Sequence, residues 1–210
     1  MIKTIIFDFG DVFINLDKKG TIERAKDIFG YDIISEQKGI ASQSISETND
    51  AYETGKISTE AFIHFYTKLA ENVSSEDLIH LWNGLIKDFP KHRLEFIKQL
   101  KEEQKYKLIL LSNTNELHIN HIIEHVPFYE EFKACFDAFY LSHEIGYRKP
   151  NEDIYRFVLS ENKLIPEECL FIDDTKQNTE AASKLGIHTW NINETIEDVV
   201  NLFKAKSELF

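Results

Sequence analysis

Four short segments of this sequence carry side chains that together suit phosphoryl-transfer chemistry. Asp8 ends an apolar run near the N-terminus, Ser112 and Asn113 follow a second run, Lys149 precedes a proline, and Asp173–Asp174 end a further run. A carboxylate can attack phosphorus and form an acyl phosphate. A carboxylate pair suits Mg²⁺, which binds through one or two carboxylates together with substrate phosphate. Hydroxyl, backbone N–H and ammonium groups can hold the phosphate oxygens. The residue types therefore indicate magnesium-assisted transfer of a phosphoryl group.

Each of these residues alone also has an ordinary structural interpretation. An aspartate after a strand is often a turn or helix-capping residue, an Asp-Asp pair is often a solvated helix start, and most lysines lie on the surface. Ser112 and Asn113 by themselves form a good helix cap. The functional interpretation therefore requires a fold that brings all four segments to one place.

The elements that would do so alternate between strands and helices. Short β-branched and aromatic runs predict five strands, at Lys3–Phe9, Lys107–Leu111, Phe136–Leu141, Cys169–Ile172 and His188–Ile192. After Pro90 helical patterns lie between them, and the capping sequence at 195–198 predicts a last helix. The alternation predicts an α/β fold, a Rossmann-like parallel sheet core flanked by helices. In such a sheet the site lies at the carboxyl ends of the strands, where three of the four segments are placed.

A long stretch after the first strand has helical periods and no convincing strand. Ser58 and Ser74 are expected as helix N-caps, the second with capping-box spacing. We therefore predict an all-helical cap at 17–90, inserted into an α/β hydrolase core at 1–16 and 91–210. The two junctions are expected hinges for closing the cap over the site.

Composition and charge disfavour several classes of partner. The chain has 210 residues, 42% hydrophobic content with 16 Phe, and a formal net charge of −12. This composition allows a substantial core and provides no basic cluster for nucleic acid or an anionic membrane. No apolar run reaches the roughly 18 residues of a membrane span, and the N-terminus has no signal-peptide layout. Cys135 and Cys169 form no CxxC pair, so buried free thiols are expected. These features predict a cytoplasmic protein, and none of them specifies an oligomeric state.

Two further sets of residues are candidates for binding. His118, His121 and His125 lie at helical spacing that could hold a transition metal, although ordinary histidines on a helix flank are the commoner case. His118 also follows the Ser112 segment closely enough to reach a substrate. Candidates for recognising the non-phosphate part of a substrate are Tyr52, Glu53 and Lys56, whose alternative is a solvated helix connection.

The order and spacing of the four segments resemble the haloacid dehalogenase superfamily. The matching sequences are FDFG at 7–10, LSNTNELH at 111–118, GYRKP at 146–150 and FIDD at 171–174. The resemblance covers essentially the whole chain, including the helical insertion. It is closer still to the bacterial α-D-glucose-1-phosphate phosphatase group, with ETGKIS at 53–58 as a shorter match in the cap. It implies a phosphatase of small phosphorylated metabolites, with sugar phosphates such as glucose 1-phosphate as substrates.

The resemblance also implies a role for each site residue. Asp8 would be the nucleophile that forms an aspartyl-phosphate, while Ser112, the Asn113 backbone N–H and Lys149 would hold the phosphoryl group. Mg²⁺ would take its protein ligands from Asp8, the Gly10 carbonyl and Asp174, with Asp173 as a further ligand or beside the metal.

One position departs from the family's pattern. Most phosphatases of the superfamily carry a second aspartate two residues after the nucleophile, as the acid that protonates the leaving group. This chain has Gly10 there, with Asp11 one residue later. Asp11 is a candidate substitute, but the offset of one residue is expected to turn its side chain elsewhere. Because general acid help is worth about 10²–10⁴-fold, we expect good leaving groups to be preferred, with sugar 1-phosphates ahead of 6-phosphates.

Three functions are compatible with these residues. The leading one is a Mg²⁺-dependent phosphatase that acts on a small phosphorylated molecule. A haloacid dehalogenase also lacks the second aspartate but needs no metal, so the Asp173–Asp174 pair counts against it. The third is a non-catalytic relative that binds a phosphorylated ligand, and the retained Asp8 and Lys149 count against it.

Overall fold

Five parallel strands form the central sheet of this computed structural model, which describes residues 1–29, 40–70 and 73–210. In chain order the strands are β1 (Thr4–Phe7), β2 (Lys107–Ser112), β3 (Ala138–Leu141), β4 (Cys169–Asp173) and β5 (His188–Asn191). Their spatial order is β3-β2-β1-β4-β5, so the chain first builds to one side of β1 and then crosses to the other side. This is a doubly wound sheet with its switch point beside β1. The predicted Rossmann-like α/β fold is confirmed.

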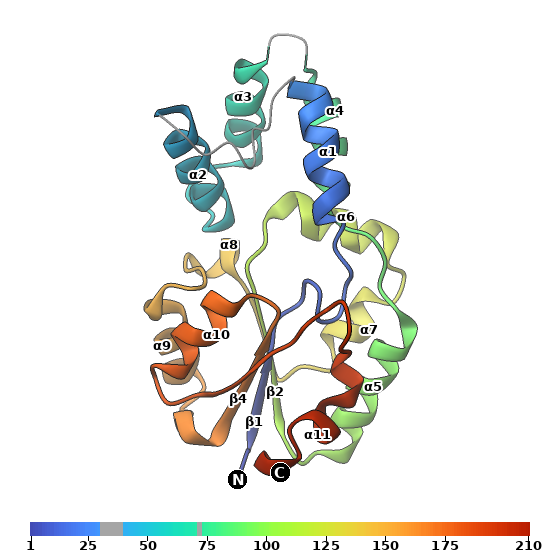
Figure 1. Cartoon of the computed structure of the whole chain (residues 1–210), viewed down its shortest axis with the longest axis vertical. Helices are drawn as coiled ribbons and strands as arrows, with labels where there is room; N and C mark the ends of the chain where they lie inside the picture. The colour runs from blue at the N-terminus through green and yellow to red at the C-terminus, as the bar shows by residue number, and fades with distance from the viewer. Residues whose placement is uncertain (30–39, 71–72) are drawn as a thin grey trace.

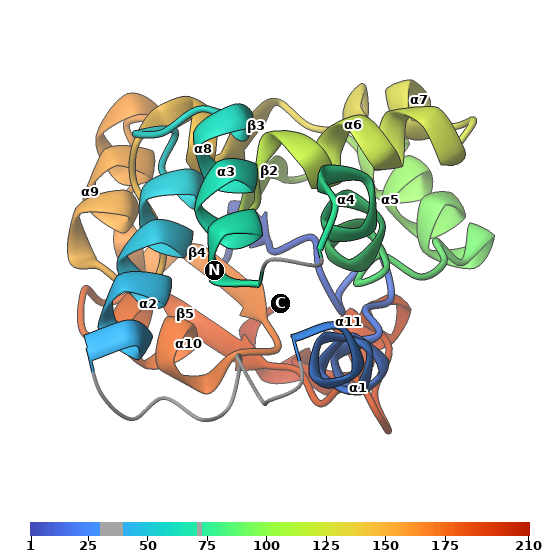
Figure 2. The same cartoon turned by 90° about the horizontal axis from the view of Figure 1, so that it is seen from above.

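Helices cover both faces of this sheet (Figures 1 and 2). One face packs against α5 (Lys91–Glu103), α6 (Glu116–His125), α7 (Tyr129–Lys133) and α11 (Leu202–Ala205), and the other against α9 (Glu152–Glu161) and α10 (Lys176–Ser183). Successive strand residues point to opposite faces. Ile5 and Phe7 therefore join the first apolar cluster, and Ile6 joins the second. Shorter elements are α8 (Ser142–Ile145) and 3₁₀ turns at Pro166–Glu168, Val199–Asn201 and Ser207–Leu209.

Four helices form a separate layer beyond the carboxyl edge of the sheet (Figure 1), and we call them the four-helix group. They are α1 (Lys18–Phe29), α2 (Ile40–Glu53), α3 (Thr59–Leu69) and α4 (Ser75–Asn83). Their facing sides share an apolar cluster that contains Phe62, Tyr66 and Leu78. Ser58 and Ser74 cap α3 and α4 as predicted, the second through a capping box.

The two chain segments that join the four-helix group to the sheet lie side by side. Asn15 N–H donates to Asp88 O at 2.8 Å, Lys87 N–H donates to Asn15 O at 3.0 Å, and Asp17 N–H donates to Leu85 O at 2.8 Å. Both predicted junctions thus belong to one hydrogen-bonded link. The division into a core and a closing cap, at the boundaries given above, stays a prediction.

Smaller expectations away from the site have mixed outcomes. No helix starts at 195–198. Asp198 is instead the N-cap of the 3₁₀ turn Val199–Asn201, which leads into α11, and Ile196 is 82% exposed. Cys135 and Cys169 are buried and free, as predicted. No helix in the described ranges is both long enough and apolar enough to cross a membrane.

Candidate active site

The sheet register places the strand-end residues side by side. Phe7 pairs with Leu110 on one neighbouring strand and with Ile172 on the other, so the residues that follow these strands emerge at one edge. Asp8 N–H donates to Ile172 O at 2.9 Å, which continues the β1–β4 pairing up to the site. Ligands bind at this edge in doubly wound folds, beside the strand where the order reverses.

Lys149 joins the two strand ends. Its side chain is only 1% exposed, and its Nζ lies 2.8 Å from Asp8 Oδ1, 2.6 Å from Asp173 Oδ2 and 2.9 Å from Leu111 O. An ammonium has three N–H donors, so each has a partner. Burial alone would lower the pKa of Lys149, but the charges of Asp173 and Asp8 outweigh burial and raise the pKa. Lys149 is therefore a fixed buried cation and not a surface lysine.

Asp8 is buried beside this cation and still ionises with difficulty. Burial raises the pKa of Asp8 to about 7, against the attraction of Lys149 and with added repulsion from Asp173 and Asp174. The three carboxylates thus need more positive charge than Lys149 supplies. A divalent cation is the ordinary way to meet that need at a strand-end acidic site.

The residues present fit Mg²⁺. Asp8, Asp173 and Asp174 each offer a carboxylate oxygen, and these oxygens lie within 4.8 Å of one another. The donor set is oxygen only, which suits a hard cation. Lys149 contacts Asp8 through Oδ1, and Lys18 contacts Asp174 through Oδ2. Asp174 Oδ1 accepts only a long contact of 3.5 Å from the Thr175 hydroxyl among the described residues, so it is open to a metal ion.

Asp173 is held by a donor that the sequence did not reveal. Asn178 Nδ2 lies 3.0 Å from both Asp173 oxygens, Thr175 N–H donates to Oδ1 at 2.8 Å, and Lys149 contacts Oδ2. Asp173 itself is fully buried. Both of its oxygens are therefore occupied by protein donors, and its geometry orients Lys149. The available signal was an amide five residues after Asp173, in the first turn of the following helix.

Asn113 also acts through its side chain. Its Nδ2 donates to Lys149 O at 2.8 Å, and its Oδ1 accepts from Lys149 N–H at 2.8 Å. This two-point clamp fixes the backbone of the buried lysine from a segment 36 residues earlier. Ser112 is buried beside it, and its Oγ makes one long contact of 3.4 Å to Asn113 O. The Ser112 hydroxyl is therefore weakly held and can turn toward a phosphate oxygen.

A second lysine reaches the acidic residues from the four-helix group. Lys18 Nζ lies 2.7 Å from Asp174 Oδ2 and 2.7 Å from Asp11 Oδ2. Asp11 Oδ1 accepts Leu16 N–H at 2.9 Å, so both oxygens of Asp11 are engaged. Asp11 also has a positive φ of 51°. The side chain of Asp11 therefore does not turn away from the site, because a carboxylate oxygen of Asp11 lies within 4.8 Å of one of Asp174, and Lys18 bridges the two residues.

The three candidate histidines differ in their surroundings. His118 is buried, with its Nε2 3.1 Å from Trp82 O and its Nδ1 3.2 Å from Asn115, and burial lowers its pKa to about 4. The ring is therefore a neutral link between α6 and α4. The rings of His121 and His125 lie against each other, with centroids 4.1 Å apart and planes tilted by 32°. No metal-holding group among the described residues includes a histidine. The transition-metal alternative has no support.

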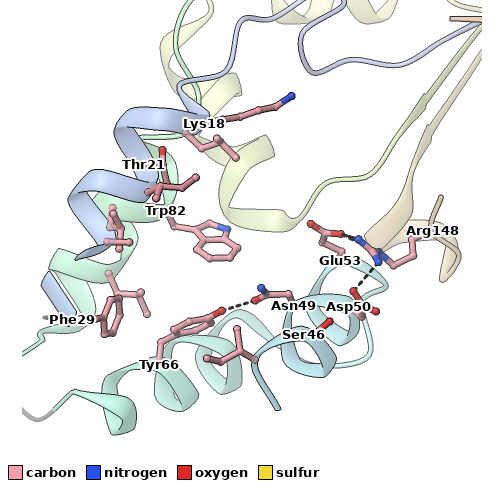
Figure 3. A pocket seen from close by; sticks show the side chains of 16 residues that line it. Lys18, Thr21, Phe29, Ser46, Asn49, Asp50, Glu53, Tyr66, Trp82 and Arg148 are labelled. Atoms are coloured by element: carbon pink, nitrogen blue, oxygen red, sulfur yellow. Dashed lines mark hydrogen bonds and ion pairs between the residues drawn. The ribbon is translucent and has the colours of Figure 1, made fainter. Parts of the chain in front are cut away.

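A cavity of about 550 Å³ lies between α1, α2, α3 and α4 (Figure 3). Figure 3 shows Phe29, Tyr66 and Trp82 opposite the polar residues of α2. Glu53 lines this cavity, and its carboxylate lies 2.8 Å from Arg148 Nη2, next to Lys149 in sequence. Tyr52 is instead buried, with its hydroxyl accepting Leu117 N–H at 3.2 Å. Lys56 lies outside the cavity lining.

Comparison with known proteins decides the family. The model of the haloacid dehalogenase-like hydrolase family matches residues 2–186. The chain belongs to this family. A D-ribitol-5-phosphate phosphatase of Bacteroides thetaiotaomicron is 28% identical over 194 residues, covering 90% of this chain and 91% of the relative.

Solved structures agree with this membership. A haloacid dehalogenase family enzyme from Bacteroides thetaiotaomicron, in complex with magnesium and inorganic phosphate, is 32% identical with a TM-score of 0.80, over 97% of this chain and 100% of that chain. An L-2-haloacid dehalogenase is 14% identical with a TM-score of 0.61, over 98% of this chain and 99% of that chain, and shows the shared fold alone. The chain is therefore a hydrolase of this family.

Proposed function

We propose that this protein is a Mg²⁺-dependent phosphatase that hydrolyses small phosphorylated metabolites through an aspartyl-phosphate on Asp8. One observation carries the proposal: a fully buried Lys149 ammonium held between Asp8 and Asp173, with the Asp174 carboxylate beside them. Burying this many charges is costly unless they serve a charged ligand. A phosphate group with a divalent cation is the ligand whose charges match.

The protein's own groups divide the work. Asp8 attacks phosphorus with its carboxylate, and Ser112 holds an oxygen of the transferring group. The positive charge of Lys149, fixed beside Asp8, stabilises the negative charge on that group. Asn113 and Asn178 keep Lys149 and Asp173 in place. Mg²⁺, bound by Asp8, Asp174 and the Gly10 carbonyl with Asp173 beside it, would offset negative charge on the carboxylates and the phosphate.

The cavity and the relatives support a substrate class. A space of about 550 Å³ with polar residues on α2 suits a small polyhydroxylated molecule. The ribitol-5-phosphate phosphatase supports sugar or polyol phosphates as substrates. Glucose 1-phosphate remains our specific candidate within that class, from the resemblance of the sequence motifs.

The test is phosphate release from a panel of sugar and polyol phosphates and from p-nitrophenyl phosphate, with Mg²⁺ or with EDTA. We expect turnover that requires Mg²⁺ and that Asp8→Asn abolishes while circular dichroism stays unchanged. Rapid quenching with labelled substrate should give an acid-stable, hydroxylamine-labile label on the peptide that contains Asp8.

Two outcomes would contradict the proposal. Release of halide from 2-chloropropionate without metal, in place of phosphate release, would make the protein a dehalogenase. Tight phosphate binding with no turnover of any ester would make it a binding protein.

A further inference from the structure

Lys18 is a cation that the motifs of the sequence did not single out. It begins α1 and belongs to the four-helix group, yet its Nζ lies 2.7 Å from Asp174 on β4's continuation and 2.7 Å from Asp11. Its partner Asp174 is 156 residues away in sequence. Lys18 therefore connects the four-helix group directly to the acidic residues of the site.

The two lysines of the site differ in the donors they have left. Lys149 uses all three N–H groups on Asp8, Asp173 and a backbone carbonyl. Lys18 uses two, on Asp11 and Asp174, and its side chain is 50% exposed. An ammonium has three N–H donors. Within the described part of the chain, Lys18 thus keeps one donor for a ligand.

The position of Lys18 indicates which part of a ligand its remaining N–H donor would contact. Lys18 lines the cavity of the four-helix group, and Figure 3 shows it at the end of α1 away from Phe29. At the same time it contacts Asp174, whose carboxylate lies within 4.8 Å of that of Asp8. It therefore lies between the cavity and the carboxylates at which the proposed function places the phosphate. In a phosphate ester the atom at that junction is the bridging oxygen, which leaves with the organic group.

We propose that Lys18 donates a hydrogen bond to the leaving oxygen of the substrate and stabilises its developing negative charge. The inference rests on the proposed phosphatase function. Such a group is needed because position 10 is a glycine and both oxygens of Asp11 are engaged. Lys18 would take the place of the missing acid as the group that contacts the leaving oxygen.

The step is balanced without a proton from Lys18. A carboxylate oxygen of Asp8 forms a bond to phosphorus, the bond from phosphorus to the bridging oxygen breaks, and its electron pair stays on that oxygen. The oxygen accepts the Lys18 N–H hydrogen bond and takes its proton from water. The products are the alcohol, the aspartyl-phosphate and hydroxide. The Lys18 ammonium keeps its ion pairs with Asp11 and Asp174 and stays charged throughout.

Two aryl esters of different leaving-group acidity test this role. Phenyl phosphate and p-nitrophenyl phosphate share a ring and differ by about three pKa units in the leaving phenol, so a steeper dependence on the leaving group shows as a changed ratio of rates. The measurement is kcat/KM, which reports the step in which the leaving group departs. Lys18→Met should lower kcat/KM for phenyl phosphate roughly tenfold more than for p-nitrophenyl phosphate. Lys18→Arg should restore most of the ratio, because it restores a charged donor.

Lys19→Met is the matched control. Lys19 is the next residue of α1, its side chain is 90% exposed, and its ion pair is with Glu23 of the same helix. This variant should leave both rates unchanged. An equal loss on both esters in Lys18→Met would overturn the inference, because a purely structural role slows both alike, and so would no loss on either. Absence of turnover in the unsubstituted protein would instead contradict the proposed function, so the two failures are distinguishable.

Discussion

Because Asp8 is buried, its ionised carboxylate is predicted to destabilise the folded protein. The side chain of Asp8 is 12% exposed, and its pKa is about 7 against an ordinary value of 3.8. Desolvation is the largest cause, and Lys149 offsets only part of it. Replacing Asp8 by Asn removes the charge with almost no change of shape. We expect Asp8→Asn to be more stable than the unsubstituted protein at alkaline pH when no Mg²⁺ is bound.

The sign and size follow from proton linkage. The folded pKa of Asp8 is raised, so between pH 3.8 and about 7 the folded protein keeps a proton that the unfolded chain has released. The stability from this proton is fully present below the unfolded pKa and is lost as pH rises through the folded pKa. Between about pH 5 and about pH 7 the loss covers two pKa units at about 1.4 kcal/mol each, or about 3 kcal/mol. Asp8→Asn lacks this loss.

The assay is urea denaturation at about pH 5 and about pH 8 in EDTA, followed by far-ultraviolet circular dichroism. The difference in unfolding free energy between Asp8→Asn and the unsubstituted protein should move by about 3 kcal/mol in favour of the variant on going to the higher pH. Asp137→Asn is the control, because the pKa of Asp137 is shifted in the opposite direction to that of Asp8. Although burial would raise the pKa of Asp137, the hydrogen bonds from Lys101 and the Leu108 N–H, together with the charges of Lys101 and Lys107, outweigh it and lower the pKa. This variant should therefore be destabilised equally at both pH values. A difference for Asp8→Asn that does not change with pH would refute the reasoning.

Three further substitutions test other parts of the site. Asp174→Asn should weaken Mg²⁺ binding by at least roughly 10–100-fold, measured by calorimetry, and unchanged affinity would remove Asp174 from the ligand set. Asn178→Ala removes two hydrogen bonds to a buried carboxylate and should cost about 2–4 kcal/mol of stability. The exposed neighbour Gln177→Ala is its control, and equal effects of the two would show that the Asp173 contact is unimportant. Gly10→Asp should raise rates on sugar 6-phosphates more than on p-nitrophenyl phosphate, because the new carboxyl group could protonate a poor leaving group. The position can accept a side chain, since an added Cβ would meet the movable end of Leu16, at 2.9 Å from Cδ1. Equal changes on both substrates would show that the new carboxyl group gives no acid help.

The fold was largely predictable because its signals are local. Apolar β-branched runs mark the five strands, and serine caps mark the starts of α3 and α4. The last turn of the chain was less predictable. Asp198 lies in a sequence that suits a capping box, but the following turn packs through Val199 and Leu202, which a capping pattern does not reveal.

The strand-end members of the site were predictable for a related reason. Once β1 and β4 are recognised as parallel strands, Asp8 and Asp173 must emerge at the same edge. The groups that hold them were not predictable in this way. Asn113 clamps Lys149 across 36 residues, and Lys18 reaches Asp174 across 156. These contacts depend on how loops and helices meet in space, and no periodicity of the sequence records them.

The charges of the site tie its chemistry to the four-helix group. Lys149 comes from a loop of the sheet part, whereas Lys18 comes from the first residue of α1, immediately after the hydrogen-bonded link at Asn15 and Asp17. A movement of α1 about this link would displace the Lys18 ammonium relative to Asp174 while leaving Lys149 between its two aspartates. Binding of the phosphate and stabilisation of the leaving oxygen would then depend on different parts of the chain. Substitutions in the link should therefore change the discrimination between phenyl and p-nitrophenyl phosphate before they change the affinity for inorganic phosphate.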